Sequence, residues 1–188
     1  MQTPCLHRFL RLIVALVTVT LLLGQFFQPA RAVELVKLEA QRSDQGVLLS
    51  FETRFDLPAS VEDALQRGVA LYFSADAQLM RSRWYWRDKE LGHAVRTRRI
   101  AYQPLTFSYK VSQGGLSQTY RSMSEALRAV QRFSQWRIGE PAAADDDKQY
   151  IEFTYKLDTE QLPRPLQIGI GSQPEWLLRV TRTIPVPE

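Results

Sequence analysis

The sequence predicts a mainly β fold: an antiparallel β-sandwich or curled sheet with two short helices, preceded by an N-terminal signal helix. Apolar and polar residues alternate with a period of two through most of residues 33–188, which is typical of strands with one buried face. Segments that contain glycine or proline separate these runs, and only two short stretches show helical spacing. Because the runs are short, we expect about seven to ten strands around one core.

The first two strands are expected to form a hairpin. Apolar residues alternate with polar ones from Val36 to Ala40, with Val36 itself on the apolar side, and again from Val47 to Phe55. The segment between them ends at Gly46, and glycine suits a tight turn. Pro58 then ends the second strand, since proline cannot donate a hydrogen bond to a neighbouring strand.

Two short helices are expected along the chain. Ser60 is a candidate N-cap for the first, over residues 60–66. The second follows Ser122, which forms a capping box with Glu125, and is expected to run to about residue 135. It presents one apolar face, which we expect to pack on a sheet. That face consists of Ala126, Leu127, Val130 and Phe133.

The remaining strands follow from the same alternation. Gln113-Gly114-Gly115 is a hairpin turn between two of them. The most regular alternation in the chain lies at 151–157, where every second residue is large and apolar. The expected strands are 69–73, 105–111, 116–121, 151–157, 166–170 and 177–183.

Residues 1–32 have the order of a secretory signal peptide. A short basic start precedes an unbroken stretch of aliphatic and threonine residues, 12–23, and then a small-residue exit that contains Ala30 and Ala32. We expect cleavage after Ala32. The product is then a single β-rich extracytoplasmic domain, residues 33–188, located in the periplasm.

A permanent membrane anchor is the alternative. A spanning helix needs about twenty apolar residues, and residues 9–27 approach this length if Arg11, Gly24 and Gln25 are tolerated. The protein would then remain attached to the inner membrane as an accessory subunit. The unbroken apolar stretch is shorter than a spanning helix, which favours the cleaved form.

Composition excludes several classes of protein. The only cysteine, Cys5, lies in the signal segment, so the mature domain has no disulfide and no cysteine zinc site. Removing the signal takes away three arginines and leaves 21 of the 24 basic residues against 20 acidic ones, a net charge of +1. We therefore expect no nucleic-acid partner. No motif indicates a cofactor or a metal site.

Residues 81–99 form the most strongly charged and aromatic segment. Seven basic residues there stand against two acidic ones, so the local net charge is +5 in a nearly neutral domain. Arginine binds phosphate or carboxylate, and tryptophan stacks on sugars or cations. We interpret the segment as a candidate surface for an anionic glycan or lipid, or for an envelope or inner-membrane protein. The candidate binding residues are Arg81, Arg83, Trp84, Trp86, Arg87, Arg96, Arg98 and Arg99.

The same segment has a structural interpretation. If residues 81–88 are a strand, Trp84 and Trp86 share one face and the arginines share the other. Buried aromatic residues are the usual case, so we expect both tryptophans in the core. The arginines then form an exposed face, which fits binding and simple solvation equally well.

No residue is predicted to be catalytic. His93 is the only histidine of the mature domain and is expected in an exposed turn, and no serine lies in the Gly-x-Ser-x-Gly motif of hydrolases. We therefore expect a non-catalytic binding or accessory module. An envelope hydrolase, built around His93 or an unrecognised pair of carboxylates, is the alternative.

Several segments resemble a known family. These are Leu71-Tyr72-Phe73, Arg83-Trp84-Tyr85-Trp86-Arg87-Asp88, Gly115-Leu116-Ser117-Gln118-Thr119-Tyr120, Glu125-Ala126-Leu127, Trp136 and Leu162-Pro163-Arg164-Pro165-Leu166. On these residues the chain resembles domain of unknown function 4390, a family of exported proteobacterial proteins without an assigned activity. The resemblance therefore implies no catalytic residue. It implies an extracytoplasmic accessory role, linked to a membrane sensor kinase and response regulator whose genes lie beside those of the family.

Overall fold

Two antiparallel β-sheets make up most of the structure, a computed structural model that describes residues 33–85, 87–140, 149–170 and 173–187. The strands are β1 (Glu34–Ser43), β2 (Gly46–Arg54), β3 (Leu71–Arg81), β4 (Lys89–Gln103), β5 (Ser108–Gln113), β6 (Leu116–Tyr120), β7 (Arg132–Gly139), β8 (Gln149–Leu157) and β9 (Arg179–Pro185). The helices in these ranges are α2 (Ala59–Gln66), α3 (Met123–Gln131) and α4 (Arg164–Ile170). The predicted mainly β fold is confirmed, with three α-helices where two were expected.

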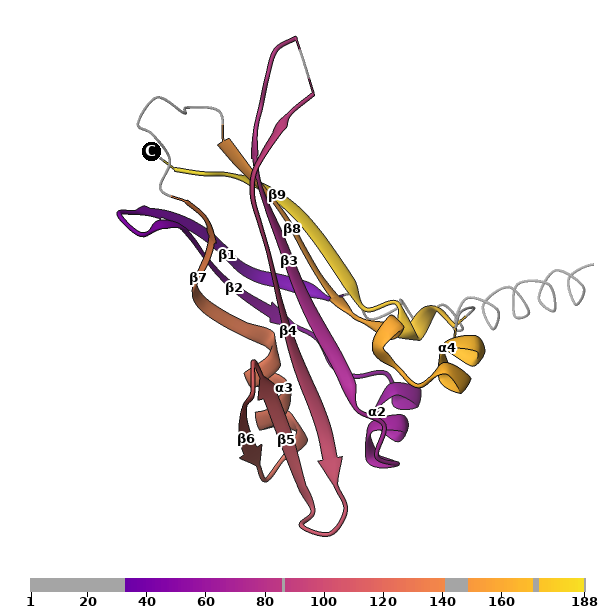
Figure 1. The fold of residues 1–188 in the computed structure, drawn as a ribbon. Helices are drawn as coiled ribbons and strands as arrows, with labels where there is room; N and C mark the ends of the chain where they lie inside the picture. The colour runs from indigo at the N-terminus through magenta and orange to yellow at the C-terminus, as the bar shows by residue number, and fades with distance from the viewer. Residues whose placement is uncertain (1–32, 86, 141–148, 171–172, 188) are drawn as a thin grey trace, which may run out of the picture. The chain divides into compact units, whose positions relative to one another are not determined.

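The strand order separates a small sheet from a large one. The small sheet has the order β1-β2-β7, and the large sheet has the order β6-β5-β4-β3-β8-β9 (Figure 1). Both the β1–β2 and the β3–β4 connections are hairpins, and β8 pairs with the other side of β3. The helix α3 leads from β6 in the large sheet to β7 in the small one, so it links the two sheets.

A cluster of aromatic rings joins the sheets. The ring of Phe51 in β2 lies 5.2 Å from that of Phe133 in β7 and 4.7 Å from that of Phe153 in β8, measured between centroids. Tyr155 of β8 is fully buried, and its hydroxyl donates a 3.0 Å hydrogen bond to the carbonyl of Val130 in α3. Burial raises the pKa of Tyr155, so the hydroxyl stays neutral and keeps its proton for that bond.

The predicted hairpin turns and one predicted cap are confirmed. Gly46 closes the β1–β2 hairpin and Gly114-Gly115 closes the β5–β6 hairpin, all with positive φ. Ser122 caps α3, because its hydroxyl accepts a 3.3 Å hydrogen bond from the backbone N–H of Glu125. The alternation predicted for β2 and β8 also holds, since every second residue of each strand is buried.

Some predicted apolar positions are exposed instead. A β-bulge in β1 between Leu35 and Lys37 turns the side chain of Val36 away from the core. Leu105 and Phe107 lie in the turn before β5 and are exposed, so this strand begins at Ser108 and not at residue 105.

Three helix-related predictions are wrong. Ser60 does not cap α2, whose N-cap residue is Pro58 and which has no side-chain cap. The helix α3 ends at Gln131, not near residue 135, because β7 follows it directly. Residues 166–170, predicted as a strand, belong to α4. Pro165 lies in the first turn of α4, where a missing N–H costs no intrahelical bond.

Parts of the sequence prediction lie outside the described residues. These parts are the signal segment 1–32 with its cleavage site at Ala30 and Ala32, the residue Trp86, and the acidic segment 141–148. No helix in the described part of the chain has both the length and the hydropathy needed to span a bilayer.

Candidate functional site

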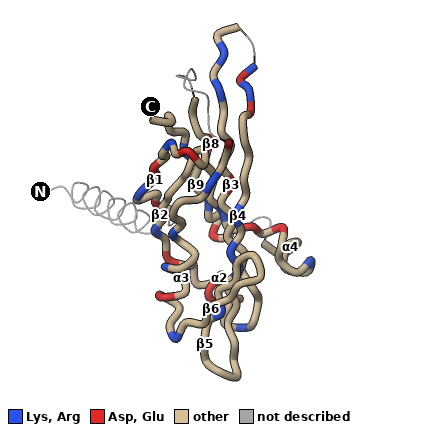
Figure 2. Tube along the Cα trace, turned by 60° about the vertical axis from the view of Figure 1, so that its left-hand side comes forward, with Lys and Arg blue, Asp and Glu red and all other residues tan. Residues whose placement is uncertain are grey.

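The connection between β3 and β4 holds the densest group of predicted binding residues. β3 ends at Arg81 and β4 begins at Lys89, so the described residues between them form a loop and not the predicted strand. We call the described residues of this connection, 81–85 and 87–89, the tip loop. Figure 1 shows this hairpin reaching beyond the neighbouring strands. Figure 2 shows basic residues on both of its arms and acidic residues on one arm.

The tip loop presents aromatic side chains to solvent. Trp84 is 88 % exposed and Tyr85 is 68 % exposed, so the prediction that Trp84 belongs to the core is wrong. The two rings touch edge to face, with centroids 4.6 Å apart and planes at 72°. The alternation of strand faces could not predict which of these side chains are buried, because the chain leaves the sheet at Arg81 and the alternation ends there.

Asp88 anchors the tip loop through both of its carboxylate oxygens. One oxygen accepts a 3.1 Å hydrogen bond from the backbone N–H of Arg83, across the loop. The other accepts a 2.6 Å hydrogen bond from the hydroxyl of Tyr150 in β8. The loop is therefore closed on itself and tied to the neighbouring strand.

These bonds shift the pKa values of both side chains. The hydrogen bond from Tyr150 and then that from the Arg83 N–H lower the pKa of Asp88, because both favour the carboxylate. The bond to Asp88, with a smaller contribution from desolvation, raises the pKa of Tyr150 to about 12. Because the pKa of Asp88 is lowered in the folded protein, its carboxylate is fully ionised and both bonds are present above the ordinary pKa of aspartate. The bonds are lost as the pH falls through the lowered pKa of Asp88. On the basic side, only the bond from Tyr150 is lost, as the pH rises through the pKa of about 12 of that hydroxyl.

Replacing Asp88 by alanine is expected to loosen the tip loop without unfolding the domain, because the carboxylate is exposed and, among the described residues, its hydrogen bonds go to the loop backbone and Tyr150. Amide hydrogen exchange at Arg83 should become roughly tenfold faster, while core amides in β3 and β8 keep their protection. Tyr150→Phe removes one of the two bonds and should give an intermediate rate. An unchanged exchange rate at Arg83 in the alanine variant would contradict the anchor.

Three exposed cations flank the aromatic pair along the chain. We call them the tip cations: Arg83, Arg87 and Lys89. With Arg81 included and Asp88 as the one acid, the tip loop carries a net charge of +3. Since Asp88 accepts bonds from the protein itself, its charge is partly engaged within the fold.

The other three predicted arginines lie elsewhere. Arg96, Arg98 and Arg99 belong to β4 and pair with residues 75, 73 and 72 of β3. The nearest of these pairs is six positions along β3 from Arg81, roughly 20 Å at the rise of a strand. Arg96 and Arg98 share the core-side face of the sheet, and Arg99 lies on the opposite face. The structure therefore divides the predicted patch into separate parts.

Arg98 has a structural role. Its guanidinium donates to the carbonyl oxygens of Ala129 and, at 2.7 Å, Arg132, at the end of α3, and to the side chain of Gln113 at 2.6 Å. It also lies 3.6 Å from the ring centroid of Phe133. Desolvation lowers the pKa of Arg98, yet arginine remains charged at any physiological pH. Arg98 is thus occupied within the fold and leaves the set of candidate binding residues.

His93 lies in β4 and not in the predicted turn. Its Nε2 lies 3.1 Å and 3.2 Å from the two carboxylate oxygens of Asp76 in β3, on the solvent side of the large sheet. Among the described residues, the hydrogen bonds of this imidazole go to Asp76 and none goes to a hydroxyl. In the same described part of the chain, no three His, Cys, Asp or Glu side chains lie together in a group that could hold a metal ion.

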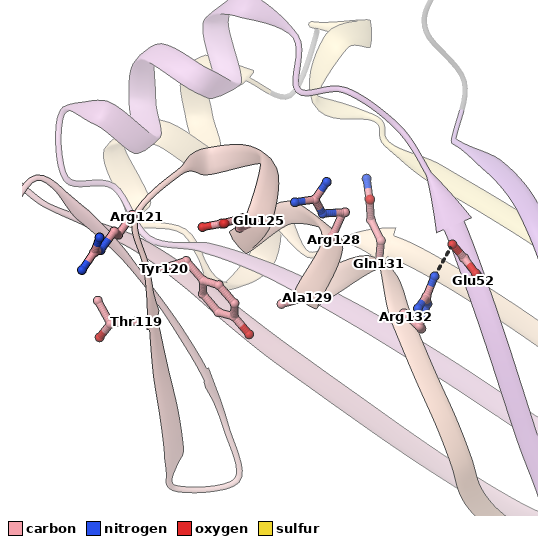
Figure 3. Close-up of a pocket in the computed structure, with 9 residues that line it drawn as sticks. All are labelled: Glu52, Thr119, Tyr120, Arg121, Glu125, Arg128, Ala129, Gln131 and Arg132. Atoms are coloured by element: carbon pink, nitrogen blue, oxygen red, sulfur yellow. Dashed lines mark hydrogen bonds and ion pairs between the residues drawn. The ribbon is translucent and has the colours of Figure 1, made fainter.

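A groove beside α3 is a second concave feature, and the sequence analysis did not identify it. Its volume is about 530 Å³, and it lies between β6, α3 and the start of β7. Figure 3 shows Arg132 and Glu52 at one end, joined by a 2.8 Å ion pair, and Arg121 at the other. The charged residues that line it are of both signs, and all except the half-buried Glu52 are exposed, so the groove favours no particular class of ligand.

Comparison with known proteins identifies the family of the chain. The model of a domain of unknown function, DUF4390, matches residues 30–184. The chain belongs to the DUF4390 family. The match includes both sheets and the tip loop, so the tip loop is part of the domain that the family model describes. No curated protein and no solved structure matches the chain.

Proposed function

We propose that this DUF4390 domain is a non-catalytic accessory module of the cell envelope that binds an anionic partner through the tip loop. One observation carries the proposal: the exposed Trp84–Tyr85 pair lies on a loop that Asp88 anchors and that also holds the exposed tip cations. Contiguous exposed apolar patches mark interaction sites, and arginine, tryptophan and tyrosine are the residues enriched in binding hot spots.

The described contacts support binding over catalysis. The one histidine–carboxylate pair is exposed and touches no nucleophile, and the groove beside α3 brings no catalytic combination together. By contrast, the anchored loop lowers the entropy cost of binding, because the backbone near Arg83 is already ordered. Both observations favour an accessory module.

We infer a periplasmic location from the signal-like order of residues 1–32. The domain is free if the chain is cut after Ala32 and attached to the inner membrane if it is not. Intact mass of the protein isolated from cells tests this: an N-terminus at Val33 supports the free form, and retention of the segment supports an anchored subunit.

Photo-crosslinking in cells tests the binding proposal. A photo-reactive amino acid at the exposed position Ser82 places the reactive group inside the tip loop without removing a tip cation. We expect an adduct whose yield falls at least about fivefold in the double variant Arg83→Ala/Arg87→Ala, and falls further with added salt because exposed charge pairs are screened. The mass of the adduct shows whether the partner is a protein, a glycan or a lipid.

A matched control is the double variant Arg164→Ala/Arg179→Ala. It removes the same charge from exposed positions in α4 and β9, and should leave the adduct unchanged. Absence of any adduct with the folded protein, or an equal loss in both double variants, would overturn the proposal, since the tip cations would then have no special role.

A further inference from the structure

The proposed function requires an anionic partner, and the geometry of the tip loop indicates the chemical class of that partner. We propose that Trp84 and Tyr85 insert into the interfacial region of a lipid bilayer that contains anionic lipids, with the tip cations on the phosphate groups. This inference rests on the proposed function and names its ligand class.

The side chains have the chemistry of the membrane interface. Tryptophan and tyrosine concentrate at the level of the lipid headgroups, because each ring is apolar with one polar group that stays hydrated. Trp84 and Tyr85 are adjacent, packed edge to face, and exposed over most of their surface. Because the side chain of Trp84 is 88 % exposed, it contacts little of its own protein. The headgroup region of a bilayer can surround this ring and bury most of its surface.

The charges suit an anionic surface. The tip loop has a net charge of +3 within a few residues of the aromatic pair. Long arginine and lysine side chains can lie along the ring surfaces and still place their charges at phosphate depth. The one acid, Asp88, accepts hydrogen bonds from Arg83 N–H and Tyr150, so it is held toward the protein.

The size of the loop favours a bilayer over a folded protein. A standard protein interface takes about 800 Å² from each partner and about 20 residues on each side. The tip loop has only eight described residues, 81–85 and 87–89, on a hairpin that reaches beyond the neighbouring strands (Figure 1). A bilayer needs no such area, because two inserted aromatic rings and a few cations suffice for reversible binding.

The experiment reads the environment of the tip loop in the full chain. Cys5→Ser with Ser82→Cys gives a single thiol in the loop, which carries an environment-sensitive fluorophore such as NBD. Vesicles of phosphatidylcholine with 30 % phosphatidylglycerol, on the order of the anionic lipid content of natural membranes, are compared with pure phosphatidylcholine. The same label at Ser117 in β6, also exposed, reports binding through any other part of the chain.

We expect a blue shift and quenching by headgroup-region nitroxide lipids at position 82 with the anionic vesicles, and neither at position 117. Trp84→Ala/Tyr85→Ala should weaken the response at position 82 on the order of tenfold. Arg83→Ala/Arg87→Ala should weaken it about 25-fold, since each cation near an anionic surface contributes about fivefold. Leu105→Ala, an exposed apolar residue in the β4–β5 turn, is the matched control and should change nothing.

Other results separate this inference from the proposed function. If position 82 gives no response to anionic vesicles while Ser82 crosslinks a discrete protein in an arginine-dependent way, the lipid inference is wrong and the binding module stands. A response equal at positions 82 and 117, or equal on both kinds of vesicle, also overturns it. If neither vesicles nor crosslinking give a signal, both proposals fall.

Discussion

Replacing Gly92 by alanine is expected to lower the free energy of unfolding by about 2–3 kcal/mol. A Cβ at this position would lie 2.6 Å from the carbonyl oxygen of Ile138 and 2.9 Å from the Cα of Gly139. Both atoms belong to the backbone of β7, so they cannot rotate away as the end of a side chain can.

The close approach has a role in the fold. Gly92 pairs with Leu79 in the large sheet, and β7 belongs to the small one, so the missing side chain lets the two sheets come within backbone contact. Gly139 has a related role, since its Cβ would lie 2.7 Å from the Cδ2 of Leu79. That atom ends a flexible side chain, and Gly139→Ala should therefore cost less than Gly92→Ala.

Urea or thermal unfolding measures the effect. A loss of 2–3 kcal/mol in a domain of this size lowers Tm by roughly 5–10 °C. Gly169→Ala is the matched control, because this glycine lies in α4 with no atom within 4 Å of its Cβ position, and alanine there should be neutral or slightly stabilising. Equal stability of the Gly92→Ala and wild-type proteins would show that the two sheets can separate at no cost.

Replacing Arg98 by alanine is expected to cost about 2–4 kcal/mol, although arginine is ordinarily a surface residue. The change leaves the carbonyl oxygens of Ala129 and Arg132 without their donor at the end of α3, and removes the contact with the ring of Phe133. Partly buried carbonyl groups that lose a charged donor account for most of the cost, and the lost packing of the arginine stem adds to it.

Denaturant unfolding of matched variants checks this prediction. Arg96→Ala lies two residues away on the same face of β4, and its side chain is exposed, so it should change stability by less than about 0.5 kcal/mol. Arg98→Lys should recover only part of the loss, because an ammonium group cannot reach Gln113 and both carbonyl oxygens in one plane. Similar stability of the Arg98→Ala and Arg96→Ala variants would show that Arg98 is a surface residue.

The different burial of these arginines also explains why the predicted binding residues do not form one surface. Every arginine in residues 81–99 was an equal candidate from the sequence, because a sequence shows charge but not burial. Arg83 lies exposed in the tip loop, whereas Arg98, only fifteen positions later, holds the end of α3. Pairing with β3 decided the difference, since it placed Arg98 opposite Phe73 on the core side.

Some features could be predicted from the sequence alone. The strands β2 and β8 follow from strict alternation, because burying one face of a strand requires a period of two. The β1–β2 and β5–β6 turns and the Ser122 cap also follow, because they depend on glycine backbone freedom and on a local serine hydrogen bond. The family resemblance rested on such local motifs as well, and it is confirmed.

Tertiary contacts decided the rest. The strand β4 was not predicted, because Gly92, Arg96 and Arg98 occupy core-side positions where large apolar residues are expected. The backbone of β7 crosses at Gly92, and the end of α3 accepts hydrogen bonds from Arg98. Trp84 is exposed because the chain leaves the sheet at Arg81, a boundary that no local pattern marks. The sequence by itself thus determined the elements whose stabilising contacts are local or periodic. The exposed aromatic pair and the structural arginine depend on contacts between residues far apart in the chain, and only the packed sheets could reveal them.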